Sequence, residues 1–244
     1  MKLKNIKEIS GKIKLITGLH IGAGETEIHI GGTDNPVVKH PFTNEPYIPG
    51  SSLKGKIRSL LELKSGLIKY SKQLNKDGEP LSMEIIKKAK ENNENKDRIE
   101  YGLKIIKLFG TSGAEENAKK MLGPTRVSFS DCMITEEMRE KAQKGEIVLT
   151  EIKAENRINR ITGTAQHPRF TERVPAGIEF NFCITLKEFE GDEGLEELLL
   201  EGMKLLEHDA LGGSGSRGYG RIKFEFNDSE IQERYNKINP FKPV

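Results

Sequence analysis

The stretch "LGGSGSRGYG", residues 211–220, carries five glycines in ten positions, with Gly213, Gly215 and Gly218 in the spacing GxGxxG. In a dinucleotide-binding site these glycines follow a strand and open a helix, whose N-terminal amides bind the pyrophosphate. Here the preceding segment has helical spacing and the following segment alternates like a strand, which argues against such a site. Two interpretations remain: a flexible turn, or a loop carrying Arg217 whose bare backbone can approach a ligand closely.

A second group of residues lies near position 50. Ser51, Lys54 and Arg58 follow one another at spacings i, i+3 and i+7 in a segment with helical periodicity, and Ser51 or Ser52 is a good N-cap for it. A hydroxyl, an ammonium and a guanidinium in one stripe suit a phosphate backbone, and the free amides of a helix N-terminus also favour anions. The alternative is an ordinary solvated helix face.

A single carboxylate, Asp34, follows two glycines in "GGTDNP", within a long Gly- and Pro-rich loop over residues 20–50. As structure, this pattern predicts a turn closed by an Asx hydrogen bond. As chemistry, the carboxylate could hold a divalent ion or orient a ribose hydroxyl for attack on a phosphate. No second carboxylate lies near Asp34 in sequence, so a two-metal nuclease site is not supported.

Positive charge is clustered although the formal net charge is only +2. The segment 153–173 has five basic residues against two acidic ones, Glu155 and Glu172. The basic residues are Lys153, Arg157, Arg160, Arg169 and Arg173. This segment has little apolar periodicity, and it is a candidate surface for phosphate contacts.

Several other site classes are excluded by residue types and spacing. The five histidines show no metal-ligand spacing, and the two cysteines form neither a disulfide framework nor a zinc pattern. His20 stands out because it ends the first predicted strand and enters the long loop. Aromatic residues make up only 6%, which disfavours base stacking as the main binding mode. No window is apolar enough for a membrane span or a secretory signal, so we expect a cytoplasmic protein without a membrane partner.

Hydrophobic periodicity also predicts the elements that position these residues. Strands are expected at residues 9–20, 127–129, 147–152 and 178–186, a helix at 195–207 and a closing strand at 220–226, around the helix that starts near Ser51. When the long loop, residues 64–123 and the basic segment are left out, the order of elements is strand, helix, strand, strand, helix, strand. This is the order of the α+β ferredoxin-like βαββαβ core. The strand at 147–152 belongs either to this sheet or to the basic segment.

Residues 64–123 differ in composition from the rest of the chain. They are solvated and rich in helix breakers, with short amphipathic pieces. We therefore expect an inserted helical subdomain here, with residues 1–63 and 124–244 forming the core.

Four blocks of sequence carry a resemblance to a known family. These are "GLHIGAG", "GGTDNPVVKHPFTNEPYIPGSSLKGKIRSLLE", "ENRINRITGTAQHPRFTERVPAGIEFNF" and "LGGSGSRGYGRIKF". Together, in this order and spacing, they strongly resemble the backbone RAMP subunit of type III-A (Csm) CRISPR effector complexes. The match covers most of the chain outside residues 64–123.

The resemblance implies that the chain polymerises along a guide CRISPR RNA, within a complex with other type III-A subunits, and cleaves paired target RNA at regular intervals. It implies that Asp34 is needed for metal-dependent cutting, with Mg²⁺ or another divalent cation. It also implies a thumb-like β-hairpin at about 153–175, which displaces one nucleotide at each interval. The residues implied in RNA binding are His20, Ser51, Ser52, Lys54, Arg58, Asn156, Arg157, Arg160, Thr164, Arg169, Gly213, Gly215 and Arg217.

Three other functions stay open at this point. The first is a non-cutting RNA scaffold, in which Asp34 only shapes its turn. The second is the RAMP endoribonuclease that processes precursor CRISPR RNA and has a similar glycine loop; the Asp-bearing loop and the thumb-like block argue against it. The third is a generic single-strand-binding module, which the scarcity of aromatic residues disfavours.

Overall fold

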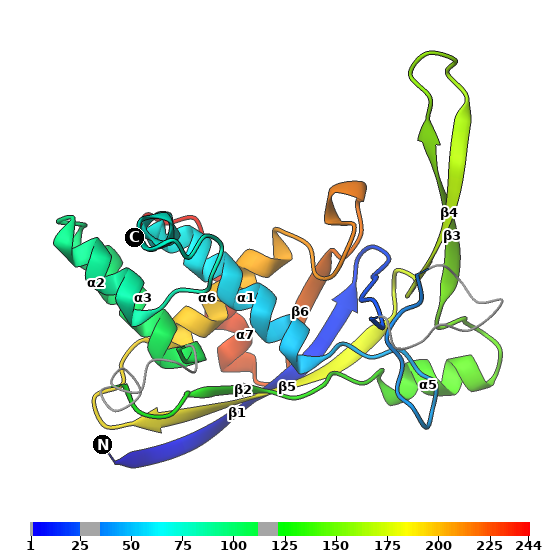
Figure 1. Ribbon diagram of the computed structural model, residues 1–244. Coiled ribbons are helices and arrows are strands. Elements are labelled where there is room, and N and C mark those ends of the chain that lie inside the picture. Colours follow the sequence, from blue (N-terminus) through cyan, green and yellow to red (C-terminus); the bar gives the residue numbers. More distant parts are fainter. Residues whose placement is uncertain (1, 25–34, 112–121) are drawn as a thin grey trace.

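A computed structural model describes residues 2–24, 35–111 and 122–244 of the chain. Its main sheet has four antiparallel strands in the order β2-β5-β1-β6, the strand order of a ferredoxin-like core. The elements of this core are β1 (Leu3–Leu15), α1 (Gly50–Ser65), β2 (Val127–Phe129), β5 (Glu179–Phe189), α6 (Leu195–Glu207) and β6 (Ile222–Phe226). Figure 1 shows α1 and α6 on one face of this sheet. The predicted α+β fold class is confirmed.

Alternation along the strands explains which face is covered. In β1, Ile9 and Ile13 are fully buried, whereas the residues between them are at least partly exposed or are glycine. The centre of the core is aromatic: the Phe182 ring stands edge-on to Phe224 and Phe226, with ring centroids 5.5 Å apart in both pairs. Alternating apolar residues with a period of two therefore form one continuous surface under the helices.

The described part of the segment between α1 and β2 is mainly helical. It contains η1 (Leu67–Leu74), α2 (Met83–Glu91) and α3 (Lys96–Phe109). Its buried side chains, such as Leu81 and Ile105, belong to the same apolar cluster as the sheet. Gly102 of α3 allows close packing, because a Cβ there would lie 2.5 Å from Leu67. The insertion thus packs on the core, and its division from that core as a subdomain stays a prediction.

The predicted N-cap of α1 is wrong. The helix begins at Gly50, after Pro49, so Ser51 and Ser52 lie inside its first turn and cap nothing. Instead, the Gly50 amide donates to the carboxylate of Asp131, 2.8 Å away. A residue 81 positions distant in sequence therefore satisfies the helix terminus.

Strand boundaries also differ from expectation. β1 covers Leu3–Leu15 rather than residues 9–20. Of the extra strand expected at 147–152, only residues 151–152 lie in a strand, at the start of β3 (Glu151–Ile158), and residues 147–150 do not. β3 pairs with β4 (Ala165–Arg173) in a separate two-stranded sheet. The ambiguity over this strand is thereby resolved in favour of the basic segment.

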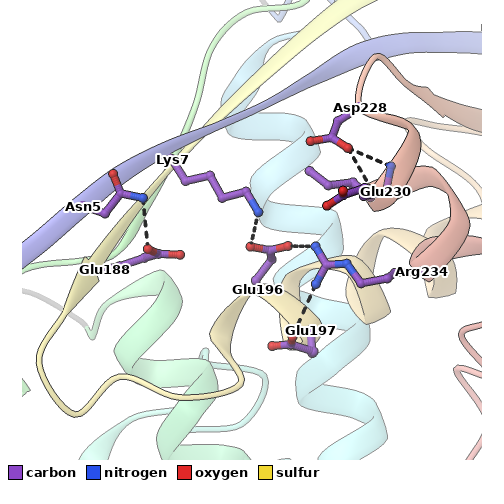
Figure 2. Close-up of polar contacts among 9 residues, drawn as sticks. Asn5, Lys7, Glu188, Glu196, Glu197, Asp228, Glu230 and Arg234 are labelled. Carbon is purple, nitrogen blue, oxygen red and sulfur yellow. Dashed lines mark hydrogen bonds and ion pairs between the residues drawn. The ribbon is translucent and has the colours of Figure 1, made fainter.

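The described residues also contain two further α-helices, α5 (Glu136–Gln143) and α7 (Ser229–Asn236), and a short 3-10 helix, η2 (Gly215–Arg217), in the glycine loop. Figure 2 shows how α7 is held beside the core. Glu196 of α6 accepts from Lys7 of β1 at 2.7 Å and also pairs with Arg234 of α7. Asp228 caps α7 by accepting from the amide of Ile231 at 3.1 Å. No helix in the described part of the chain is both long and apolar enough to cross a membrane.

Candidate nucleic-acid interface and cleavage site

The basic segment forms a β-hairpin, β3 and β4, which stands away from the sheet and the helices in Figure 1. The hairpin expected at about 153–175 is thus present, although its first strand starts at Glu151. Large apolar side chains are exposed on it, including Ile161 at 95% and Ile152 at 62%. The predicted contact residues Asn156, Arg157, Arg160, Thr164 and Arg169 are all exposed. Their side chains are accessible to an RNA lying along the hairpin, and RNA binding by them stays a prediction.

The glycine loop, residues 211–220, packs against residues 18–20, which follow β1. The Gly213 amide donates to the carbonyl of His20 at 2.8 Å, and the Gly220 amide donates to Gly18 at 2.9 Å. Gly212 has φ +75°, and a Cβ there would lie 2.3 Å from the His20 carbonyl oxygen. Only glycine permits this approach. Two predicted sites, His20 and the glycine loop, are therefore brought together by backbone contact.

The His20 ring is fixed by the base of the hairpin. Its Nδ1 lies 2.7 Å from the carbonyl oxygen of Glu172. Since a carbonyl can only accept, Nδ1 carries the proton of this bond, and in the neutral ring Nε2 is the acceptor. The ring orientation is thus set by the chain from β4.

Asp34, the candidate catalytic residue, lies outside the described residues. The chain that follows it is described: the Glu172 amide donates to the carbonyl of Asn35 at 3.1 Å. The described chain on the two sides of residues 25–34 also comes together, because Gly22 and Val37 form an antiparallel bridge. Asn35 therefore lies at the base of the hairpin, next to Glu172. The carbonyl of Glu172 also contacts the His20 ring.

A second set of contacts joins the glycine loop to the hairpin. Glu155 of β3 forms an ion pair with Arg217 at 3.0 Å and accepts from the hydroxyl of Tyr219, also at 3.0 Å. The cations of Lys153 and Arg173 each lie 4.9 Å from the centre of the Tyr219 ring. Burial, followed by the hydrogen bond to Glu155, raises the pKa of the Tyr219 hydroxyl. Arg217, predicted to bind RNA, thus has a protein partner in this structure.

Sequence reasoning missed the residues that make these connections. Glu155 and Glu172 were visible as the two acidic residues of the basic segment. Acidic residues isolated among basic ones were a signal of specific ion pairs, and the structure contains one at each position. Tyr219 was the single aromatic residue of the glycine loop.

The stripe on α1 is only partly exposed. Ser51 is exposed, whereas Ser52, Lys54 and Arg58 are half-buried. Burial, and then the charge of Arg58, lowers the pKa of Lys54. No carboxylate within the described ranges forms an ion pair with Lys54. A phosphate beside this ammonium would supply the missing negative charge.

Arg58 has contacts within the protein. It donates to Glu62 at 2.7 Å and to the carbonyl of Leu81 at 3.0 Å. The Leu81 amide also donates to Glu62 at 2.9 Å. Arg58 therefore connects α1 to the inserted helices, and its predicted role in RNA binding is not tested by these contacts.

Comparison with known proteins gives the family. The sequence model of the RAMP superfamily matches residues 12–223. The chain belongs to the RAMP superfamily. Within it, the chain belongs to the Csm3 family, because curated relatives of that name are similar to it along most of their length.

Three of these similarities illustrate the relationship. The "CRISPR system Cms endoribonuclease Csm3" of Methanothermobacter thermautotrophicus is 40% identical over 246 residues, which cover 93% of this chain and 85% of the relative. The protein of the same name from Methanocaldococcus jannaschii is 41% identical over 227 residues, covering 92% and 80%. A crystal structure of a "Csm3-Csm4 subcomplex in the type III-A CRISPR-Cas interference complex" has a TM-score of 0.53 and 28% identity, covering 98% of this chain and 99% of that chain.

The described part of this RAMP protein offers no ready-made metal site. No group of three or more His, Cys, Asp or Glu side chains in residues 2–24, 35–111 and 122–244 could hold a metal ion. Glu172, the carboxylate beside Asn35, is occupied by Lys39 at 2.6 Å and by the amide of Val37 at 3.0 Å.

We expect Lys54→Ala to weaken RNA binding of this RAMP chain and to reduce the slope of log affinity against log salt by about 1, as for loss of one phosphate contact. Lys56→Ala is the matched control on the same helix, because Lys56 already pairs with Asp209 at 2.7 Å. Fluorescence anisotropy with single-stranded RNA at several salt concentrations measures both slopes. Equal slopes for the two variants would show that Lys54 does not contact an RNA phosphate.

Proposed function

We propose that this chain is a backbone subunit of a type III-A CRISPR effector complex and that it cleaves target RNA paired to the guide. Membership of the Csm3 family supports this, since the curated relatives are named as CRISPR endoribonucleases. In this proposal the partners are guide CRISPR RNA, target RNA, further copies of the chain and other subunits of the complex. The site of action is the cytoplasm.

One observation supports a location for the cleavage site at the base of the hairpin. The chain next to Asp34, the His20 ring and the glycine loop all meet at the base of the exposed hairpin. An RNA held along the glycine loop and α1 would pass this base, where the hairpin can displace a nucleotide. Displacement turns the neighbouring ribose, so that its 2′-hydroxyl can align with the scissile phosphate.

In the proposed mechanism the hairpin contributes geometry and Asp34 contributes negative charge. The Asp34 carboxylate either orients the attacking hydroxyl or holds a divalent ion beside the phosphate. Such an ion, when bound, would supply positive charge at the scissile phosphate. Backbone contacts through the glycine loop and Lys54 do not read bases, so target choice is left to pairing with the guide.

The proposal is tested by target cleavage in the guide-loaded complex with Mg²⁺. We expect Asp34→Ala to slow cutting by about 100-fold or more, the usual scale for loss of one preorganised electrostatic group. Guide affinity should change by less than about twofold, because the backbone contacts remain. The rate is measured on labelled complementary RNA, with EDTA added in a second series.

Asp77→Ala is the control, because Asp77 is an exposed acidic residue of the insertion. Cutting of target at the wild-type rate by Asp34→Ala would contradict the assignment of Asp34. A wild-type complex that leaves the target RNA intact would support the non-cutting scaffold function. Processing of a repeat hairpin by the isolated chain would favour the enzyme that processes precursor CRISPR RNA.

A further inference from the structure

Glu172 occupies an unusual position at the base of β4. Its side chain is only 10% exposed, and its two carboxylate oxygens accept from different partners. Lys39 donates to Oε1 at 2.6 Å, and the Val37 amide donates to Oε2 at 3.0 Å. Burial by itself would raise the pKa of this carboxyl, but hydrogen bonds from Lys39, the Val37 amide and the Thr150 side chain together outweigh burial and lower it.

The backbone of the same residue makes two further connections. The Glu172 amide donates to the carbonyl of Asn35 at 3.1 Å. The Glu172 carbonyl lies 2.7 Å from Nδ1 of His20. One residue of the hairpin thus contacts three positions of the segment 35–39, which directly follows Asp34, and also orients the His20 ring.

We propose that Glu172 is a positioning residue for cleavage, which anchors the segment after Asp34 to the hairpin base and so sets where the cut falls relative to the displaced nucleotide. This inference rests on the proposed function. Its physical basis is the spacing between two points of action. The hairpin displaces a nucleotide and Asp34 acts on a phosphate, and a rigid link between the hairpin and Asp34 keeps the distance between these two points constant. A misplacement of about 1 Å at a reacting centre can cost about 100-fold in rate.

Glu45 provides a matched control, because it lies in the same stretch of chain between Asn35 and the start of α1. It accepts from Arg139 of α5 at 2.8 and 3.2 Å, and its side chain is 15% exposed. The hydrogen bond from Arg139 lowers the pKa of Glu45. Glu45 therefore matches Glu172 in charge, burial and pairing, but it is tied to α5 instead of the hairpin.

The first experiment follows amide hydrogen exchange in the full chain, without any cleavage assay. We expect Glu172→Gln to raise exchange of peptides covering residues 35–40 by about tenfold, because a glutamine cannot form the ion pair and accepts with only one oxygen. Glu45→Gln should leave this peptide unchanged. The melting temperature is recorded for both variants, so that local opening is separated from general loss of stability.

The second experiment uses the guide-loaded complex and labelled target RNA. We expect Glu172→Gln to keep guide affinity within about twofold, to slow single-turnover cutting by about tenfold and to spread the cuts over neighbouring phosphates. Lys39→Met should act in the same way, and the double variant should be no worse than either single variant, because both remove one connection. Glu45→Gln should cut at the wild-type rate and positions.

The outcomes distinguish failure of the positioning role of Glu172 from failure of the proposed function of the chain. Wild-type cut positions and rate in Glu172→Gln overturn the positioning role, as does exchange equal to that of Glu45→Gln. A wild-type complex that cuts nothing contradicts the proposed function itself, and the exchange data then still decide whether Glu172 anchors the segment.

Discussion

Gly220→Ala is expected to unfold the glycine loop and to lower RNA affinity by about tenfold or more. Gly220 has φ +75°, and a Cβ at this position would lie 2.0 Å from the carbonyl oxygen of Leu211. That carbonyl cannot retreat freely, because the Leu211 amide donates to Gly220 and the Gly220 amide donates to Gly18, both at 2.9 Å. We expect the free energy of unfolding to fall by about 3 kcal/mol, more than the left-handed backbone conformation alone would cost.

Gly218→Ala is the matched control. Gly218 has φ +84°, but apart from its own neighbours in the chain no atom of the described residues would lie within 4 Å of a Cβ added there. Only the conformational cost of about 1 kcal/mol should appear, with little change in RNA affinity. Urea unfolding and RNA titration measure the two quantities, and equal losses in both variants would show that close packing at Gly220 is unimportant.

The second large effect is expected from Arg126→Ala, through stability alone. Arg126 and Asp192 are 3% and 4% exposed, and they form an ion pair at 2.8 Å. Lys107 of α3 joins the same carboxylate at 3.1 Å. Removing Arg126 leaves a buried carboxylate with only Lys107, so we expect a loss of about 3–5 kcal/mol in the free energy of unfolding.

The control for this variant is Arg234→Ala on α7, whose side chain is 45% exposed where it meets Glu196 (Figure 2). A solvated pair of this kind should contribute less than about 1 kcal/mol. Denaturant unfolding at neutral pH compares the two variants, and a loss at Arg126 no larger than that at Arg234 would contradict the prediction.

The Arg126 pair also predicts a pH dependence. Burial alone would raise the pKa of Asp192, but hydrogen bonds from Arg126 and Lys107 outweigh it and lower that pKa. The stability from this pair is therefore complete above the unfolded-state pKa and is lost as the pH falls through the lowered folded-state value. The difference between wild type and Arg126→Ala should accordingly shrink in acid.

Elements with a strong period were predictable because their own side chains specify a buried face. The alternation through Phe180 and Phe182, and the leucines of residues 195–207, correspond to β5 and α6 in the structure. α5 and α7 were not predicted: each has eight residues and few buried positions, such as Met138 and Ile231. Short helices of this kind are stabilised mainly by tertiary packing, which a local pattern does not contain.

The start of α1 shows the same limit for a polar group. Ser51 and Ser52 have the side chains of a good cap, but Asp131, from the segment after β2, satisfies the Gly50 amide instead. Which donor meets which acceptor depends on how the chain returns, and not on residue type alone.

The sequence by itself determined the ferredoxin-like order of elements, the basic segment and the glycine loop, because periodicity, charge clustering and glycine content act locally along the chain. The hairpin form of the basic segment was implied only by the family resemblance. Only the tertiary structure decided that Glu155 joins the hairpin to the glycine loop and that Glu172 joins it to the segment after Asp34. These pairs link residues 62 and 135 positions apart, and contacts of such separation arise from the folded path of the chain.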